Sequence, residues 1–227
     1  SAVTSRNLTN YRCWGLIQLL FWLPATVWGQ WELLEKQKVA QAQEVARDRK
    51  GFLYYTEPNG NIHKLDTLGQ EVALYSPRQQ GQPTTLDAWQ NLRVYTFSEE
   101  LQTFRILDRF LAETRELPGR FPELPYLRQM APDNQGQLWL IDGAARLLHY
   151  DPRQRQILQK TLLQPLLPLS GGTEWAELRF YQNRLYLLEQ SQSFLWIFDN
   201  MGNPLKKLQL PNTHRLGFEG QQAYFLS

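Results

Sequence analysis

The sequence predicts an all-β protein, a β-propeller of four-stranded blades, from its composition and from two markers that recur together. The chain has 227 residues, of which 42% are hydrophobic and 13% aromatic, and this excludes intrinsic disorder. Its length suffices for one sizeable core. The markers repeat every 38 to 47 residues. Four short strands per unit at such a period are typical of propeller blades.

The first marker is an aromatic residue inside a short strand-forming triplet. Successive aromatics are separated by 41, 44, 47 and 38 residues. Because equivalent positions of a repeat pack in equivalent ways, we expect these side chains to fill the spaces between blades rather than to stack on sugars. The aromatics are Tyr54, Tyr95, Trp139, Tyr186 and Tyr224.

The second marker is a short apolar run that ends in an aspartate, 12 or 13 residues after each of the first four aromatics. A calcium site needs several oxygen ligands close together, whereas one aspartate per unit beside a turn is suited to accept backbone N–H bonds. We therefore expect turn caps rather than calcium ligands. The four aspartates are Asp66, Asp108, Asp151 and Asp199.

Residues 1–29 have the pattern of a secretory signal peptide. Two arginines precede an apolar run from Trp14 to Trp28, and the segment has no acidic residue. The run is short for a membrane span and contains Pro24, and we place the cleavage after Gly29. The alternative is an uncleaved membrane anchor. The only cysteine, Cys13, precedes the run, which argues against a lipoprotein. A single cysteine also excludes a disulfide scaffold and a cysteine-based zinc cluster.

The second predicted domain is the propeller itself, residues 30–227. Without the first 29 residues the chain carries 22 Lys+Arg and 22 Asp+Glu. This balance favours neither nucleic acid nor an anionic membrane surface as a partner. After cleavage of the signal peptide we expect no stable membrane insertion. Residues 31–46 fit either a short helix or a chain that leads into a strand.

The fifth unit contains Tyr224, but its aspartate would fall near position 236 or 237. The sequence therefore predicts four complete repeats and part of a fifth, a propeller that is truncated at its C-terminus. We expect the part present to form an open arc or an incompletely closed ring.

Two of the repeats carry a D-x-x-G-x-L-aromatic motif, at Asp48 to Tyr54 and at Asp133 to Trp139. With this motif the chain resembles the broad NHL and lactonase-like propeller group over residues 39–227. The second and fourth units depart from it, with Gln-Asn pairs at 90–91 and 182–183. The resemblance implies a fold and does not imply one activity.

The first strand of each blade is expected to line the central channel, and the loops at its ends to form a rim where ligands bind. In lactonase-like propellers such positions hold a divalent metal, so the resemblance implies Asp87, Asp133 and Glu177 as equivalents. Asp133 also belongs to an Asp-x-x-Gly turn, and a metal site or a histidine-based site among the scattered His63, His149 and His214 is not expected. The ligand-binding candidates are Asp87, Trp89, Asp133, Glu174, Trp175, Glu177 and His214.

The sequence contains no G-x-S-x-G elbow, phosphate-binding loop or dinucleotide fingerprint, so no catalytic residue and no cofactor is predicted. The resulting hypothesis is an exported, non-catalytic propeller that acts as a protein-binding or scaffold module of the bacterial cell envelope. One alternative is a metal-dependent lactonase-like hydrolase with its site in the channel. Another is a carbohydrate-binding module that uses Trp89 and Trp175.

Overall fold

The computed structural model describes residues 41–89, 93–117, 123–165, 174–191, 193–220 and 222–226. The chain divides into two compact units, residues 1–38 and 39–227, and the described residues belong to the second. The predicted signal peptide and its cleavage point lie outside the described residues. Of the ambiguous segment 31–46, the described end leads into the first strand. The described part contains no helix that is long and apolar enough to span a membrane.

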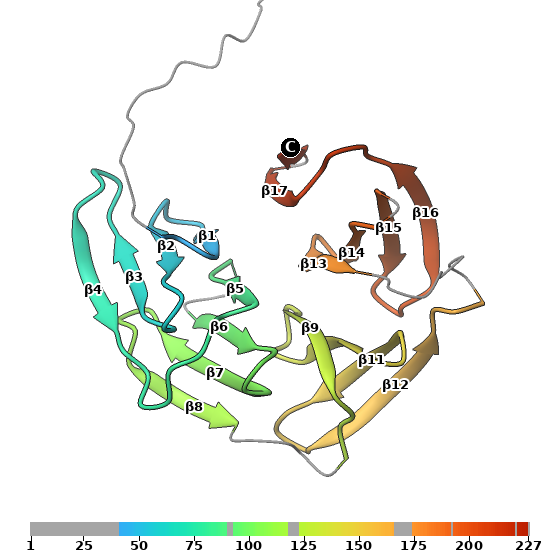
Figure 1. The fold of residues 1–227 in the computed structure, drawn as a ribbon, viewed down its shortest axis with the longest axis horizontal. Coiled ribbons are helices and arrows are strands. Elements are labelled where there is room, and N and C mark those ends of the chain that lie inside the picture. The colour runs from blue at the N-terminus through green and yellow to red at the C-terminus, as the bar shows by residue number, and fades with distance from the viewer. Residues whose placement is uncertain are drawn as a thin grey trace, which may run out of the picture. The chain divides into compact units, whose positions relative to one another are not determined.

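The described residues form four sheets of four strands and one sheet of two, each sheet built from consecutive antiparallel strands. In Figure 1 the sheets follow one another around a common centre, with β1, β5, β9, β13 and β17 innermost. This arrangement confirms the predicted propeller. The strands are β1 (Val45–Arg47), β2 (Leu53–Thr56), β3 (Ile62–Leu65) and β4 (Glu71–Tyr75) in blade 1; β5 (Thr85–Asp87), β6 (Arg93–Ser98), β7 (Thr103–Asp108) and β8 (Glu113–Leu117) in blade 2; β9 (Leu127–Pro132), β10 (Leu138–Asp142), β11 (Arg146–Asp151) and β12 (Gln156–Leu162) in blade 3; β13 (Trp175–Tyr181), β14 (Arg184–Glu189), β15 (Phe194–Asp199) and β16 (Pro204–Gln209) in blade 4; and β17 (Arg215–Glu219) and β18 (Gln222–Leu226) in the fifth sheet.

The repeat aromatics occupy the same strand of each complete blade, as predicted. Tyr54, Tyr95 and Trp139 are at most 3% exposed, whereas Tyr186 is half-buried. Each buried aromatic belongs to a core cluster shared by two neighbouring blades. The core of this protein is therefore a series of layers between blades, with the aromatics as their largest members.

The repeat aspartates cap turns, also as predicted. Asp199 is representative, because its Oδ1 accepts hydrogen bonds of 2.8 Å from the backbone N–H groups of Met201 and Asn203. Asp66, Asp108 and Asp151 bond two backbone N–H groups of their turns in the same way. First and third strands of a blade run in the same direction, so the turns that follow them lie at one end of the blades. We call this end the aspartate-turn face.

Side chains rather than strand pairing join the fifth sheet to blade 1 in the described part of the chain. The Arg215 guanidinium donates to both Glu44 carboxylate oxygens, at 2.5 and 2.7 Å, and to the Gln43 carbonyl oxygen at 3.0 Å. The bonded residues lie 171 and 172 positions apart in the chain. Burial raises the pKa of Glu44 and the Arg215 guanidinium opposes the shift.

Replacing Arg215 by methionine is expected to lower the free energy of unfolding by about 1–3 kcal/mol. Breaking a fully buried ion pair costs about 3–5 kcal/mol. The Arg215 side chain is 38% exposed, so water relieves part of the cost. Urea unfolding would measure the loss, with exposed Arg184→Met as the matched control. Equal stability of the two variants would show that the Arg215–Glu44 pair does not hold the ring together.

Candidate functional site

Three charged side chains of the inner strands β5 and β13 pair with one another. Arg179 on β13 donates from Nε to Glu177 Oε1 at 2.6 Å and from Nη1 to the Leu86 carbonyl oxygen at 2.7 Å. Its Nη1 also lies 3.5 Å from Asp87 Oδ2, and its side chain is only 13% exposed. Burial raises the pKa of Asp87, and Arg179 opposes that shift. The three side chains thus compensate one another's charge in a buried place.

Neighbouring inner strands are tied to this group by further hydrogen bonds. Glu177 Oε2 accepts from the backbone N–H of Leu216 on β17 at 2.6 Å. Gln129 on β9 donates from Nε2 to the Trp175 carbonyl oxygen at 3.1 Å. Through Arg179 and Leu216, the predicted channel residues Asp87 and Glu177 thus link β5, β13 and β17, and Gln129 separately links β9 to β13.

The structure does not gather the seven predicted residues into one site. Asp87 and Glu177 meet at Arg179. Asp133 follows β9 at the aspartate-turn face, where its Oδ1 accepts two backbone N–H bonds and its Oδ2 lies 3.0 Å from His149 Nε2. Trp89 follows β5 at that same face.

The other three candidates lie where the inner strands begin. Trp175 is the first residue of β13, and Trp89 contacts Tyr181, the last residue of that strand, with ring centroids 5.3 Å apart. Six strand residues span roughly 20 Å. Glu174 and His214 lie at the same end, because both are hydrogen-bonded to Gln190: the Glu174 carbonyl oxygen accepts from its backbone N–H, and His214 Nδ1 lies 3.0 Å from its Nε2. Trp89 and Trp175 are therefore too far apart to bind one sugar ring together.

Within the described residues, no three His, Cys, Asp or Glu side chains come close enough to hold a metal ion. Asp87 and Glu177 face an arginine instead. The three carboxylates implied by the lactonase-like resemblance therefore form no metal site in this arrangement.

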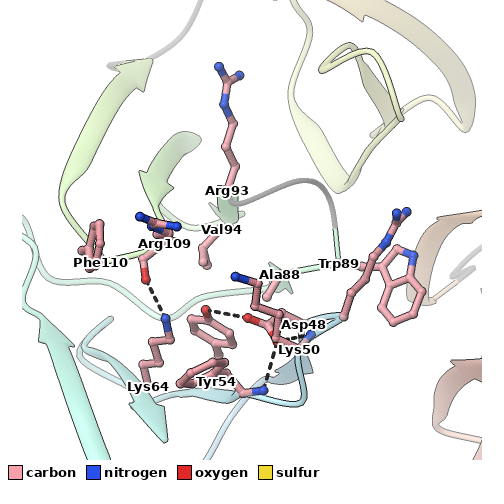
Figure 2. Close-up of a pocket in the computed structure, with 12 residues that line it drawn as sticks. Asp48, Lys50, Tyr54, Lys64, Ala88, Trp89, Arg93, Val94, Arg109 and Phe110 are labelled. Atoms are coloured by element: carbon pink, nitrogen blue, oxygen red, sulfur yellow. Dashed lines mark hydrogen bonds between the residues drawn. The ribbon is translucent and has the colours of Figure 1, made fainter. Parts of the chain in front are cut away.

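A pocket of about 400 Å³ opens between blades 1 and 2 on the aspartate-turn face. Figure 2 shows that its lining comes from the turns after β1 and β7, from β2 and β3, and from the loop and strand around β5 and β6. We call it the blade 1–2 pocket. Its lining residues are Asp48, Arg49, Lys50, Phe52, Tyr54, Lys64, Ala88, Trp89, Arg93, Val94, Arg109 and Phe110.

Positive charge dominates this pocket. Arg49, Lys50, Arg93 and Arg109 are exposed, and within the described part of the chain none of them is paired with a carboxylate. Asp48 is the only acidic residue among the described residues of the lining. The surface can thus accept negative charge from a ligand.

The one carboxylate of the pocket is already occupied. Asp48 Oδ1 accepts from the backbone N–H groups of Lys50 at 2.9 Å and Phe52 at 3.0 Å, and Oδ2 accepts from the Tyr54 hydroxyl at 3.2 Å. Asp48 therefore fixes the turn that carries Arg49 and Lys50, and its single negative charge stands against five cations in the described lining.

Lys64 forms part of the pocket's inner wall. It is 8% exposed, donates from Nζ to the Arg109 carbonyl oxygen at 2.6 Å, and lies 4.3 Å from the centroid of the Phe52 ring. Burial lowers the pKa of Lys64. Because its hydrogen bond joins blade 1 to the turn after β7, Lys64 positions the Arg109 turn against the pocket.

Aromatic side chains continue from the pocket toward the channel. Arg49 lies over the Trp89 ring at 5.2 Å, Trp89 contacts Tyr181, and Tyr181 stacks on Phe218 with centroids 4.7 Å apart. This row runs from blade 2 through blade 4 to the fifth sheet. Tyr181 is buried, so of this row only Trp89 and Phe218 are partly exposed.

From the sequence, Trp89 was predicted as a binding residue and Tyr54 as a core aromatic. The cations of the pocket were not predicted. A signal was available, because the turn residues that follow Asp48 and Asp108 are Arg49-Lys50 and Arg109-Phe110. The matching positions in blade 3 are Asn134-Gln135 and Pro152-Arg153. Comparing the turns after the first and the third strands of each unit would have shown basic residues on two adjacent blades.

No protein-family model and no curated protein matches this sequence. Among solved structures, the chain is similar to streptogramin B lyase, with 14% identity and a TM-score of 0.57 over 81% of this chain and 61% of that one. It is similar to the WD40 domain of Neurospora crassa Pan2, with 12% identity and a TM-score of 0.54 over 74% of this chain and 50% of that one. It is also similar to BBS1N, in a structure of its complex with ARL6DN, with 11% identity and a TM-score of 0.51 over 77% of this chain and 56% of that one.

The chain thus spans between 50% and 61% of the length of these three structures. At such low identities the likeness shows a fold and no activity. On both the strand arrangement and these similarities, the chain is a β-propeller.

Proposed function

We propose that this propeller is a non-catalytic protein-binding module and that its aspartate-turn face carries the binding surface. The observation that carries the proposal is the blade 1–2 pocket, with its four exposed cations and its aromatic wall. Rims built from turns on a rigid scaffold are common sites of recognition. Arg and aromatic residues are also enriched where proteins bind one another.

The channel supports the non-catalytic part of the proposal. A general acid, base or metal ligand needs a side chain that is free to face a substrate. Asp87 and Glu177 are instead bonded to Arg179 and to the backbone. The lactonase-like and carbohydrate-binding alternatives stay predictions from the sequence, and no feature of the described residues favours them.

Export is a further part of the proposal and rests on residues 1–29 alone. Their basic-then-apolar pattern supports a module that acts in the periplasm or cell envelope of a bacterium, or outside the cell. N-terminal sequencing of the protein recovered from such a cell should find Gln30 first.

Site-specific photo-crosslinking tests the proposed binding face. The full chain would be produced in a bacterium with a photoreactive phenylalanine derivative at Phe110, which borders the pocket and is 68% exposed, or at Leu162 of β12, which is 56% exposed. We expect a discrete protein adduct from position 110 and none from position 162. Adducts from position 162 alone, or from neither position, would contradict the proposal.

A further inference from the structure

We propose that the blade 1–2 pocket seats an acidic segment of the partner protein, with a carboxylate between Lys50 and Arg109 and an apolar side chain against Phe52 and Trp89. This inference rests on the proposed function and specifies the chemistry of its partner. It assigns the pocket to an extended, acidic peptide rather than to a small anion.

Charge is the first argument. Five cations line the pocket against the single carboxylate of Asp48, which already accepts three hydrogen bonds. Cations that line one recess repel one another and are stabilised by a negative ligand. A hydrogen bond between charged partners in such a place is stronger than a neutral one.

The shape of the pocket is the second argument. Its volume of about 400 Å³ has room for a few side chains, and its floor contains Phe52, Tyr54, Ala88 and Val94. An inorganic anion would leave the exposed parts of Phe52 and Trp89 in water, whereas a peptide covers them with an aromatic or aliphatic side chain. Figure 2 shows Arg109 and Phe110 on one side of the floor and Trp89 on the other.

The continuation of the surface is the third argument. The aromatic row from Trp89 through Tyr181 to Phe218 extends beyond the pocket toward the channel. Tyr181 is buried, but a segment of several residues can contact the pocket together with the partly exposed Phe218 at the far end of the row. A single small molecule of the pocket's volume cannot.

Fluorescence anisotropy with the intact chain tests the inference. The probe is a labelled decapeptide with one phenylalanine among glutamates, compared with the same peptide carrying glutamines. We expect the glutamate peptide to bind, to weaken as salt is raised, and to bind more tightly than the glutamine peptide. The double variant Lys50→Gln with Arg109→Gln should weaken its binding by at least about tenfold, the value of one charged hydrogen bond.

The matched control removes the same net charge elsewhere, as Lys160→Gln with Lys206→Gln on β12 and β16. All four side chains are exposed, so both doubles should melt within about 2 °C of the parent. An equal loss of affinity in both doubles would reduce the effect to net charge and overturn the inference. Tight binding of the glutamine peptide, or displacement of the glutamate peptide by an equal concentration of inorganic phosphate, would also overturn it.

Failure here is distinguishable from failure of the proposed function. If neither peptide binds while position 110 still crosslinks to a partner, the acidic-segment inference is wrong and the binding face remains. If position 110 gives no adduct, the proposed function fails whatever the peptides do.

Discussion

Replacing Arg179 by methionine is expected to lower the free energy of unfolding by about 3–5 kcal/mol, because it leaves two buried carboxylates without their cation. Glu177 and Asp87 lie 2.6 and 3.5 Å from its guanidinium nitrogens. Their side chains are 6% and 5% exposed, so water cannot take the place of the lost charge. Urea or thermal unfolding measures the loss.

Two controls separate the charge effect from simple loss of packing. Lys207→Met removes an exposed cation from β16 and should change stability by at most about 0.5–1 kcal/mol. Adding Glu177→Gln and Asp87→Asn to Arg179→Met removes the uncompensated charges and should recover much of the loss. No recovery, or a loss by Arg179→Met within about 1 kcal/mol, would mean that the paired charges do not hold the channel together.

Replacing Trp139 by alanine is expected to cost about 3–5 kcal/mol, the usual range for a large aromatic removed from a core. Trp139 is 1% exposed and stacks on His149 with centroids 4.2 Å apart. A Cβ at Gly202 of blade 4 would lie 3.2 Å from its ring, so the indole fills the space between blades 3 and 4. Chemical denaturation would give the loss as a lower midpoint.

Tyr186→Ala is the matched control, because Tyr186 holds the equivalent place in blade 4 but is half-buried. Its loss should be clearly smaller than that of Trp139→Ala. Equal losses would show that the position within the repeat, and not the burial between blades, sets the cost.

The sequence predicted the blades well because each one repeats the same local chemistry. Tyr95 and Trp139 mark the second strand of their blades, and Asp108 and Asp151 cap the turn after the third. The aspartates bond backbone groups a few residues away and the aromatics pack against the next blade, so both recur at a fixed spacing that the sequence reveals. The antiparallel pairing and the direction of each strand follow from the turns.

The candidate site was harder to predict because its partners come from distant parts of the chain. Arg179 lies 93 residues from Leu86, whose carbonyl oxygen it bonds, and no local pattern relates them. The sequence analysis placed Asp87 and Glu177 in the channel but did not foresee that Arg179 would pair with both. The pocket likewise unites Lys64 with the turn of Arg109, 45 residues later, through an ordinary backbone carbonyl.

The central claim is that the channel charges hold the fold while the blade 1–2 pocket binds. The most direct test titrates the labelled glutamate peptide against the parent chain, the Lys50→Gln, Arg109→Gln double and Glu177→Gln, with each variant's melting temperature recorded in the same buffer. The account predicts that the pocket double loses at least about tenfold in affinity and keeps its melting temperature. It predicts that Glu177→Gln, whose carboxylate bonds Arg179 and Leu216, melts lower and keeps its affinity. Loss of peptide binding in Glu177→Gln with an unchanged melting temperature would place the binding site in the channel and contradict the account.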